Sequence, residues 1–281
     1  MIKELLAEGK SKLSAANINE VDGEILLAHL LGLSRMELHN PLKLEAALKL
    51  IDFEEIQELY LNFIERRVSN EPTQYITGTA YFRELELSVG PGVLIPRPET
   101  EGVVSFALNQ IKDQQGEISV IDLGSGSGAI ALAIATENPS TRVIAVENSD
   151  AALFWLKENV AKYVPDLRVV EGDVSEVLEG VKADLVLTNP PYVPNSTSLP
   201  LDVFNHEPHS ALFGGESGLE IPKNFIEAAA RLLKTGGLLV IEHGEEHEVG
   251  IYELLKSDFD TIKLHFDLNN RPRFTSARRK N

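Results

Sequence analysis

The chain has 281 residues and a formal net charge of −17, with 43% hydrophobic and 25% charged residues. This length favours two domains, and the composition is typical of a globular protein with a sizeable core, which excludes wholesale disorder. The absence of cysteine excludes disulfides, thiolate metal ligands and a cysteine nucleophile. Because the negative charge repels phosphate backbones, we expect no stable binding to nucleic acid.

No apolar run approaches the ~18 residues that a membrane-spanning helix requires, and the first residues lack the apolar core of a signal peptide. We therefore expect a cytoplasmic protein without membrane contacts. Residues 271–281 hold five basic side chains and no acidic one. A solvated basic end of the chain explains this cluster more simply than a binding patch does.

Residues 1–70 carry apolar side chains at helical spacing, for example Ile56 and Phe63, and no strand-like alternation interrupts them. Gly32 predicts the end of one helix, and the Asn-Pro pair that begins at Asn40 predicts a break before another. The pattern indicates a small all-helical domain.

Residues 71–98 have a different character, because prolines and glycines interrupt short apolar runs. The stretch from Leu85 to Val89 alternates apolar and polar side chains, as a strand does. We predict a linker that contains a hairpin.

After Glu99, short apolar strands alternate with helical patterns to the end of the chain. The predicted strands cover residues 119–123, 142–146, 168–170, 184–188 and 238–242. Most are Val, Ile or Leu runs bounded by Gly, Asp or Asn, which is typical of strands buried on both faces of a parallel sheet. The pattern predicts a doubly wound, Rossmann-like α/β domain over residues 99–281, whose ligands bind at the carboxyl ends of the strands.

The first predicted strand runs into a loop with three alternating glycines. The loop consists of Gly124, Ser125, Gly126, Ser127 and Gly128. Glycine permits a tight turn and the close approach of a ligand to the backbone. The dinucleotide fingerprint spaces its glycines as G-x-G-x-x-G, whereas the spacing G-x-G-x-G fits a methyl-donor loop better. The apparent G-x-S-x-G match follows from the repeat itself and does not indicate a serine hydrolase.

Two acidic residues follow the next two predicted strands. Glu147 can accept hydrogen bonds from both hydroxyls of a ribose, although an exposed strand-end glutamate is an equally good explanation. Asp173 can accept a hydrogen bond from an adenine amino group, or it can cap the helix that follows it. Both residues fit a nucleotide-like ligand.

Asn189, Pro190, Pro191 and Tyr192 directly follow the predicted strand 184–188. The lone pair of an amide or exocyclic amino nitrogen is delocalised, so the nitrogen is a poor nucleophile until acceptors hold its N–H groups. The Asn189 side chain and the Pro190 backbone supply two carbonyl acceptors. The prolines preorganise both, and Tyr192 offers a flat face to a planar group. The motif predicts methylation of such a nitrogen.

The glycine loop and this motif together resemble those of class I methyltransferases that act on amino or amide nitrogen. Further segments narrow the resemblance to the HemK/PrmC family of release factor glutamine methyltransferases, and it extends from about residue 70 to the C-terminus. These segments are Glu71-Pro72-x-Gln74-Tyr75-Ile76-x-Gly78 with Phe82, Val93 through Glu101, Glu207-Pro208-x-x-Ala211-Leu212-Phe213-Gly214-Gly215-x-x-Gly218-Leu219, and Asp267-Leu268-x-x-Arg271.

The resemblance implies transfer of a methyl group from S-adenosyl-L-methionine to the side-chain amide nitrogen, N5, of a glutamine. That glutamine would belong to the GGQ motif of class I peptide chain release factors, the implied protein partners. The glycine loop, Glu147 and Asp173 would hold the donor, and Asn189 through Tyr192 would hold the glutamine, with Asn189 also touching the donor. Arg97, Thr100 and Glu101 would close over the methionine end of the donor.

The chain departs from the family pattern at three places. Glu147 replaces the more usual aspartate, and Val174, which also belongs to the predicted donor site, stands where an aromatic side chain often stacks near adenine. His243 and Gly244 follow Glu242. The first two changes could weaken donor affinity without changing the identity of the donor.

A pocket for one glutamine side chain cannot distinguish one exposed glutamine from another. We therefore expect residues 1–70 to act as a substrate-recognition domain. Three alternatives remain: methylation of adenine or guanine amino groups in DNA or RNA, a non-catalytic binding module, and a nicotinamide-dependent dehydrogenase. The acidity of the chain argues against methylation of nucleic acid, and the intact motifs argue against a non-catalytic module. The glycine spacing argues against a dehydrogenase. His206 and His209 lack metal-ligand spacing, so no metal is expected.

Overall fold

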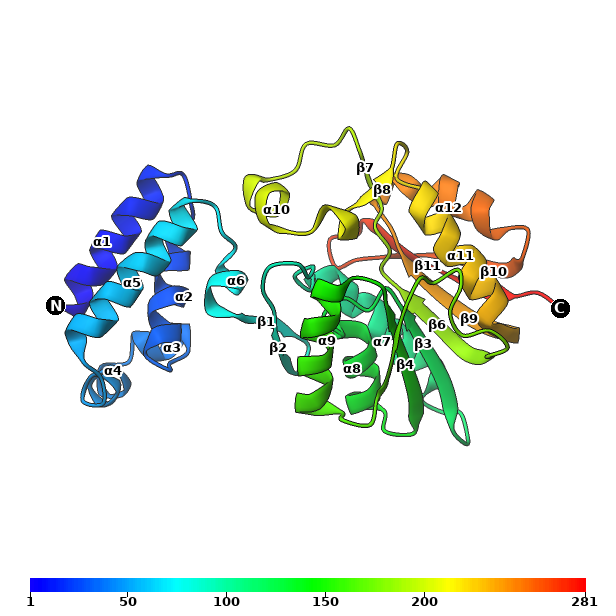
Figure 1. Ribbon diagram of the computed structural model, residues 1–281, viewed down its shortest axis with the longest axis horizontal. Coiled ribbons are helices and arrows are strands. Elements are labelled where there is room, and N and C mark those ends of the chain that lie inside the picture. Colours follow the sequence, from blue (N-terminus) through cyan, green and yellow to red (C-terminus); the bar gives the residue numbers. More distant parts are fainter. The chain divides into compact units, whose positions relative to one another are not determined.

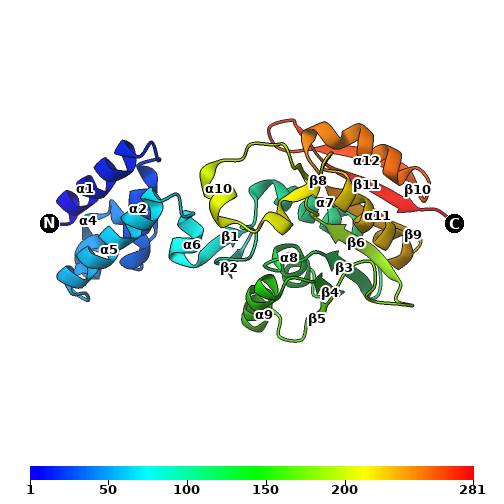
Figure 2. The same ribbon diagram turned by 45° about the horizontal axis from the view of Figure 1, so that its top comes forward.

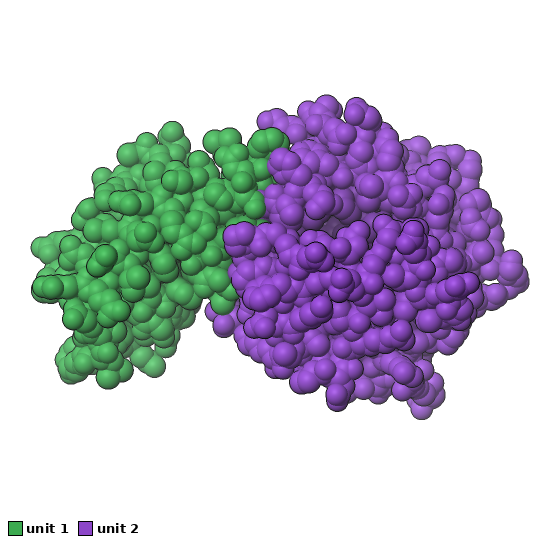
Figure 3. All heavy atoms as spheres, in the orientation of Figure 1, with its two compact units in different colours: residues 1–79, 199–206 green, residues 80–198, 207–281 purple.

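The computed structural model describes residues 1–281, and the chain divides into two compact units (Figure 3). The helical unit comprises residues 1–79 and 199–206, and the sheet unit comprises residues 80–198 and 207–281. None of the helices combines the length and the apolar character that a membrane-spanning helix requires.

The helical unit confirms the predicted all-helical N-terminal domain. Its helices are α1 (Ile2–Ala15), α2 (Val21–Leu30), α3 (Arg35–Leu38), α4 (Pro41–Leu48), α5 (Phe53–Val68), α6 (Thr73–Thr77) and α10 (Leu201–His206). Asn40 caps α4, whose first residue is the proline that marked the predicted break. Leu13, Leu27 and Ile64 are fully buried in its apolar core.

A close approach between α1 and α5 depends on Gly9. A Cβ atom at Gly9 would lie 2.2 Å from the hydroxyl oxygen of Tyr60, which is itself fully buried. Only glycine therefore fits at this point of α1. The two helices run side by side in Figures 1 and 2.

The observed division of the chain differs from the predicted one in two places. The segment 71–98, predicted as a linker, is shared between the units: α6 belongs to the helical unit, and β2 (Leu85–Ser88) of the hairpin belongs to the sheet unit. The other strand of the hairpin, β1 (Thr79–Phe82), begins at the boundary. Residues 199–206 lie in the helical unit although they follow the Asn-Pro-Pro-Tyr motif in sequence.

Contacts with α5 and its C-terminal end explain the place of α10. Arg67 pairs with Asp202 over 3.6 Å, and the His206 ring nitrogen Nε2 lies 3.4 Å from the Ser69 carbonyl oxygen. These partners are more than a hundred residues apart in the chain. No local pattern could have predicted their contact.

The sheet unit confirms the doubly wound, Rossmann-like prediction. Its seven strands lie in the order β10-β11-β9-β6-β3-β4-β5. The five inner and edge strands that pair in parallel are β3 (Ile118–Leu123), β4 (Thr141–Glu147), β5 (Arg168–Glu171), β6 (Ala183–Thr188) and β9 (Leu233–Glu242). The antiparallel strands β10 (Phe259–Phe266) and β11 (Pro272–Arg279) complete the sheet. A short pair, β7 (Val193–Pro194) and β8 (Phe213–Gly215), stands apart.

Helices cover both faces of this sheet (Figures 1 and 2). One layer contains α7 (Glu101–Ile111), α8 (Ala129–Glu137) and α9 (Asp150–Tyr163), and the other contains α11 (Glu220–Leu232) and α12 (Glu248–Leu255). Single turns of 3-10 helix occur at Pro98–Thr100, His209–Ala211 and Glu245–His247. The second layer buries Ile226, Leu232 and Ile251 against the sheet residues Val186 and Leu239. The parallel strands are thus apolar on both faces because both faces are covered.

Candidate active site

A cavity of about 250 Å³ opens at the carboxyl ends of β3, β4, β5 and β6. One water molecule needs only ~10–15 Å³, so the cavity can hold a larger ligand. Of the predicted site residues, the following line it: Arg97, Thr100, Gly124, Ser125, Gly126, Ser127, Glu147, Asp173, Val174, Asn189 and Pro191. Glu101, Gly128, Pro190 and Tyr192 do not line it.

The three glycines of the loop have different surroundings, although all have positive φ, at +70°, +55° and +86°. A Cβ atom at Gly126 would meet only Val93, at 3.9 Å, so the loop leaves space for a ligand there. A Cβ atom at Gly128 would lie 2.7 Å from Leu156 of α9, so this glycine serves the packing of helices. At Gly124, the Cβ would lie 3.0 Å from Phe225.

The Glu147 carboxylate is held in place by backbone N–H groups. Its Oε2 accepts from Gly126 at 2.8 Å, and its Oε1 accepts from Asn148 and Ser149 at 2.9 Å each. The side chain is buried at the end of β4 and lines the cavity. These bonds orient the two carboxylate oxygens at the cavity wall, where they can accept hydrogen bonds from hydroxyl groups.

Asp122 lies near the end of β3, just before the glycine loop, and was not predicted as a site residue. Its Oδ2 accepts from the backbone N–H of Ala131 at 3.1 Å, near the start of α8, and burial raises the pKa of Asp122 to about 7. The carboxyl group therefore joins β3 to α8 on either side of the loop. Its position at the end of a strand was the available sequence signal.

No helix follows Asp173, because turns connect β5 to β6, so the predicted alternative of a helix cap is wrong. The contact of Asp173 with an adenine amino group stays a prediction. Its Oδ1 accepts from the backbone N–H and the hydroxyl of Ser175, at 2.8 and 2.6 Å, and these bonds lower the pKa of Asp173. The residue also lines the cavity, next to Val174. The turn therefore occupies one carboxylate oxygen and leaves Oδ2 for a ligand.

The side-chain amide of Asn189 is oriented by Thr100. Asn189 Nδ2 donates to Thr100 Oγ1 at 3.2 Å, which leaves the carbonyl oxygen Oδ1 as an acceptor in the cavity. The preceding Thr188 donates from its hydroxyl to the Leu123 carbonyl at 2.8 Å and fastens the end of β6 to β3. The glycine loop and the Asn189 amide thus start from neighbouring strands.

The hydroxyl of Tyr192 donates to Glu242 Oε1 at 3.3 Å, and burial raises the pKa of the phenol. The ring therefore contacts the end of β9. Stacking of Tyr192 on a planar substrate group stays a prediction. Glu101 is also engaged elsewhere, since its Oε1 accepts from the backbone N–H of Arg83 at 3.0 Å.

Arg97 lines the cavity and forms an ion pair with a residue that the sequence did not indicate as its partner. Its guanidinium donates to Glu207 Oε1 at 2.5 Å, while Glu207 Oε2 accepts from the Ile95 N–H at 3.1 Å. The Glu207 side chain is almost completely buried. Glu207 is the first residue of the segment 207–219 that resembles the family. The sequence therefore singled out this residue but did not indicate its contact with Arg97. The remaining unpredicted wall residues include Ser210, Ile221, Asn224 and Phe225.

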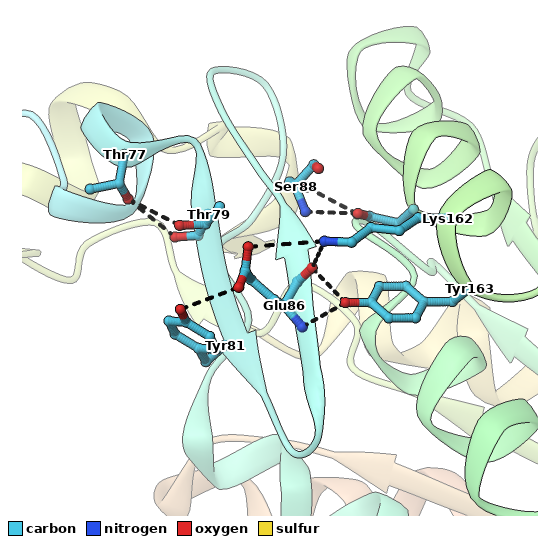
Figure 4. A network of polar contacts seen from close by, with 8 residues as sticks. Thr77, Thr79, Tyr81, Glu86, Ser88, Lys162 and Tyr163 are labelled. Atoms are coloured by element: carbon cyan, nitrogen blue, oxygen red, sulfur yellow. Dashed lines mark hydrogen bonds and ion pairs between the residues drawn. The ribbon is translucent and has the colours of Figure 1, made fainter. Parts of the chain in front are cut away.

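Helix α9 connects the hairpin to the glycine loop. Figure 4 shows Glu86 of β2 between Tyr81 on one side and Lys162 and Tyr163 on the other. The Tyr163 hydroxyl accepts from the Glu86 N–H at 2.9 Å and donates to its carbonyl at 2.8 Å.

The fully buried Asn159, one turn earlier in α9, makes the same kind of contact with Ser88. It accepts from the Ser88 N–H at 2.7 Å and donates to the Ser88 carbonyl at 2.9 Å. Its Nδ2 also donates to the Ser127 carbonyl in the glycine loop at 2.9 Å. A single side chain therefore ties β2, α9 and the loop together.

The fold and the site together define a class I, S-adenosylmethionine-dependent methyltransferase. The sequence matches the methyltransferase small domain over residues 104–204 and the PrmC N-terminal domain over residues 4–78. A release factor glutamine methyltransferase of Streptomyces coelicolor is 39% identical and covers 98% of this chain and 96% of that protein. The corresponding protein of Corynebacterium glutamicum is 34% identical and covers 98% of both. The chain belongs to the family of release factor glutamine methyltransferases.

Solved structures support the fold. A methyltransferase from Pyrococcus furiosus has a TM-score of 0.53 at 17% identity, covering 82% of this chain and 100% of that one. A 16S rRNA methyltransferase of T. thermophilus, solved with AdoMet and guanosine, has a TM-score of 0.52 at 21% identity, covering 72% and 50%. At these identities the likeness concerns the fold alone.

Proposed function

We propose that this protein transfers a methyl group from S-adenosyl-L-methionine to the side-chain amide nitrogen N5 of a glutamine in the GGQ motif of class I release factors. The observation that carries the proposal is the Asn189 amide: its nitrogen is engaged by Thr100, and its carbonyl oxygen is an acceptor in the cavity that also contains Gly126 and Glu147. The family of the chain supports the choice of substrate.

The residues of the cavity fit the donor in two respects. Gly126 has open space where a side chain would stand, so a ligand can touch the backbone. The Glu147 carboxylate is fixed as an acceptor for ribose hydroxyls. The donor, when bound, supplies an electrophilic methyl group on a sulfonium.

The protein then has to hold and activate the glutamine amide. Asn189 Oδ1 lies at the cavity wall and can accept one N–H bond of the target. The Pro190 backbone carbonyl, which does not itself line the cavity, is the proposed acceptor of the other, and the two acceptors would stabilise the positive charge that develops on nitrogen. One N–C bond forms as the C–S bond breaks, and the nitrogen afterwards loses one proton to water. No residue has to remove that proton before the methyl group arrives.

The direct test is to incubate the protein with purified class I release factors and isotopically labelled donor, and to analyse the peptides by mass spectrometry. We expect one methyl group on the glutamine of the GGQ motif. Matched reactions with double-stranded DNA and with RNA separate the rival substrates, because the same acceptor pair also suits adenine and guanine amino groups. Label in nucleic acid but not in the release factor would refute the proposal.

The helical unit is proposed as the surface that recognises the intact release factor. Its support is twofold: the unit has its own apolar core, and it supplies no residue to the cavity. Large apolar side chains are also exposed on it, notably Met36, Leu42 and Leu50 at 82%, 79% and 86%. Such side chains are frequent at protein interaction sites.

A further inference from the structure

Arg97 is the only basic residue in the wall of the cavity, and a buried carboxylate holds its side chain. The guanidinium Nη2 donates to Glu207 Oε1 at 2.5 Å. The Glu207 side chain is 1% exposed, whereas that of Arg97 is 31% exposed. An arginine carries five N–H donors in a rigid plane, so the bond to Glu207 fixes the guanidinium and leaves other donors for a ligand.

The backbone around Arg97 is fixed as well. Pro96 and Pro98 flank the residue, and its φ of −100° and ψ of 141° are those that a following proline favours. Glu207 Oε2 accepts from the Ile95 N–H at 3.1 Å. One carboxylate therefore holds both the side chain of Arg97 and the backbone two residues before it.

The order of the strands places Arg97 at one end of the proposed donor site. Asp173, which follows β5, and Glu147, which ends β4, provide the proposed adenine and ribose contacts at the other end. From β4 the edge of the sheet continues to β3, with the glycine loop, and then to β6, which Asn189 follows. Thr100 contacts Asn189, and its backbone N–H donates to the Arg97 carbonyl at 3.1 Å. A donor with its adenosine at β5 and β4 therefore extends its methionine portion toward Arg97.

The charges of the cavity wall match those of the donor. The acidic residues Glu147 and Asp173 lie where the adenosine would present neutral hydroxyl and amino groups. The carboxylate of the methionine portion is the only anionic group of S-adenosyl-L-methionine, and the side chain of a target glutamine is neutral. A guanidinium binds a carboxylate through parallel N–H bonds that are stronger than bonds between neutral groups. The single basic residue of the wall thus fits the donor carboxylate better than it fits the target amide.

We propose that Arg97 binds the carboxylate of the donor's methionine portion, and that Glu207 is a positioning residue that fixes the guanidinium for this contact. Glu207 lies 110 residues farther along the chain and does not itself line the cavity. The inference rests on the donor of the function proposed above. It adds a residue that acts on the donor only through Arg97.

The first experiment uses two ligands that differ only in the carboxylate, S-adenosylhomocysteine and its decarboxylated analogue. In calorimetry, Arg97→Met should raise the Kd of S-adenosylhomocysteine about tenfold or more, as expected for loss of one charge-assisted contact. The Kd of the decarboxylated analogue should not rise, because this ligand is a cation and the variant removes a positive charge. Glu137→Gln is the control, since Glu137 pairs with Arg83 outside the cavity, and both Kd values should stay unchanged in it.

The second experiment is a double-mutant cycle that tests the role of Glu207. Glutamine has the size of glutamate but only one carbonyl oxygen, so Glu207→Gln can accept from Arg97 or from Ile95 but not from both. The variant should raise the Kd of S-adenosylhomocysteine about threefold or more. In the Arg97→Met background the same substitution should have no further effect, because the group that Glu207 positions is absent. Thermal unfolding checks that each variant is folded.

An unchanged Kd for S-adenosylhomocysteine in Arg97→Met, or an equal loss of affinity for both ligands, would overturn the carboxylate contact. An effect of Glu207→Gln that persists undiminished in Arg97→Met would show that Glu207 supports only the fold. If Glu207→Gln does not fold, Glu207→Asp, which keeps the charge but shortens the side chain, takes its place in the cycle. Failure of the wild type to methylate any release factor would instead refute the proposed function, and the comparison of ligands would remain valid.

Discussion

Asn189 and Gly126 serve the same cavity in different ways. Asn189 contributes an amide whose orientation decides whether it can accept a hydrogen bond. Gly126 has no side chain and a positive φ, and it thereby leaves open space in the cavity. Loss of an oriented acceptor should affect the transition state most, and loss of open space should affect binding most. The two residues therefore allow turnover and donor binding to be tested separately.

For Asn189→Ala we expect a fall in kcat of about 10² to 10³, the range for removal of one preorganised electrostatic contact. Donor affinity measured by calorimetry should stay close to that of the wild type. Asn195→Ala is a suitable control, since this exposed asparagine contacts Glu216 and lies outside the cavity. A wild-type rate in Asn189→Ala would exclude the proposed role.

For Gly126→Val we expect no measurable donor binding, because the branched side chain would occupy the space that the donor needs. Gly116 offers a matched control: it also has positive φ, at +91°, but nothing lies within 4 Å of its Cβ position. Gly116→Val should reproduce the backbone strain and keep donor affinity. If calorimetry on a folded Gly126→Val protein gave the wild-type Kd, the donor would have to bind elsewhere.

At the scale of elements, the glycine loop proposed to bind the donor depends on α9 and on the hairpin. Side-chain groups of α9 pair with the backbone of β2 much as a neighbouring strand would (Figure 4). Because Asn159 also holds the Ser127 carbonyl, the position of the loop is coupled to this contact. The hairpin thus supports the proposed donor site, although it contributes few residues to the cavity wall.

Replacement of Asn159 by Leu should be costly, since it leaves three backbone groups without their partner, two of them partly buried at Ser88 and one buried at Ser127. Each unsatisfied group costs about 1–3 kcal/mol, and the free energy of unfolding from urea titration should fall by at least ~2 kcal/mol. Donor affinity should fall as well. Tyr163→Phe, which loses more exposed bonds to Glu86 and none to the loop, should leave the donor Kd unchanged. Equal donor Kd values in all three proteins would show that Asn159 supports only the fold.

At the scale of the whole molecule, binding of the donor and recognition of the release factor are proposed to reside in different units. Residues 199–206 complicate removal of the N-terminal domain, because they belong to the helical unit and would be left without partners. Surface substitutions in the full-length protein are the cleaner test.

We expect the triple variant Met36→Ser, Leu42→Ser, Leu50→Ser to raise KM for an intact release factor by about tenfold or more, equivalent to ~1.4 kcal/mol. The donor Kd should not change. Exposed apolar residues of the sheet unit provide the control, and Val249→Ser with Leu268→Ser should leave KM unaltered. An unchanged KM in the triple variant would place recognition elsewhere.

The sequence by itself determined the elements whose physical cause is local. Alternation of apolar strands with helices predicted the doubly wound sheet, and Gly124 through Gly128 followed by Asn189 through Tyr192 predicted the chemistry, because backbone conformation and short-range spacing define these motifs. Only the tertiary structure decided that Thr100, 89 residues before it, orients Asn189, that Glu207 holds Arg97, and that α10 belongs to the helical unit. Glu242 looked like any acidic residue at a strand end. It is buried and accepts a hydrogen bond from Tyr192, a contact that sequence spacing does not reveal because the two residues converge only when the strands pair.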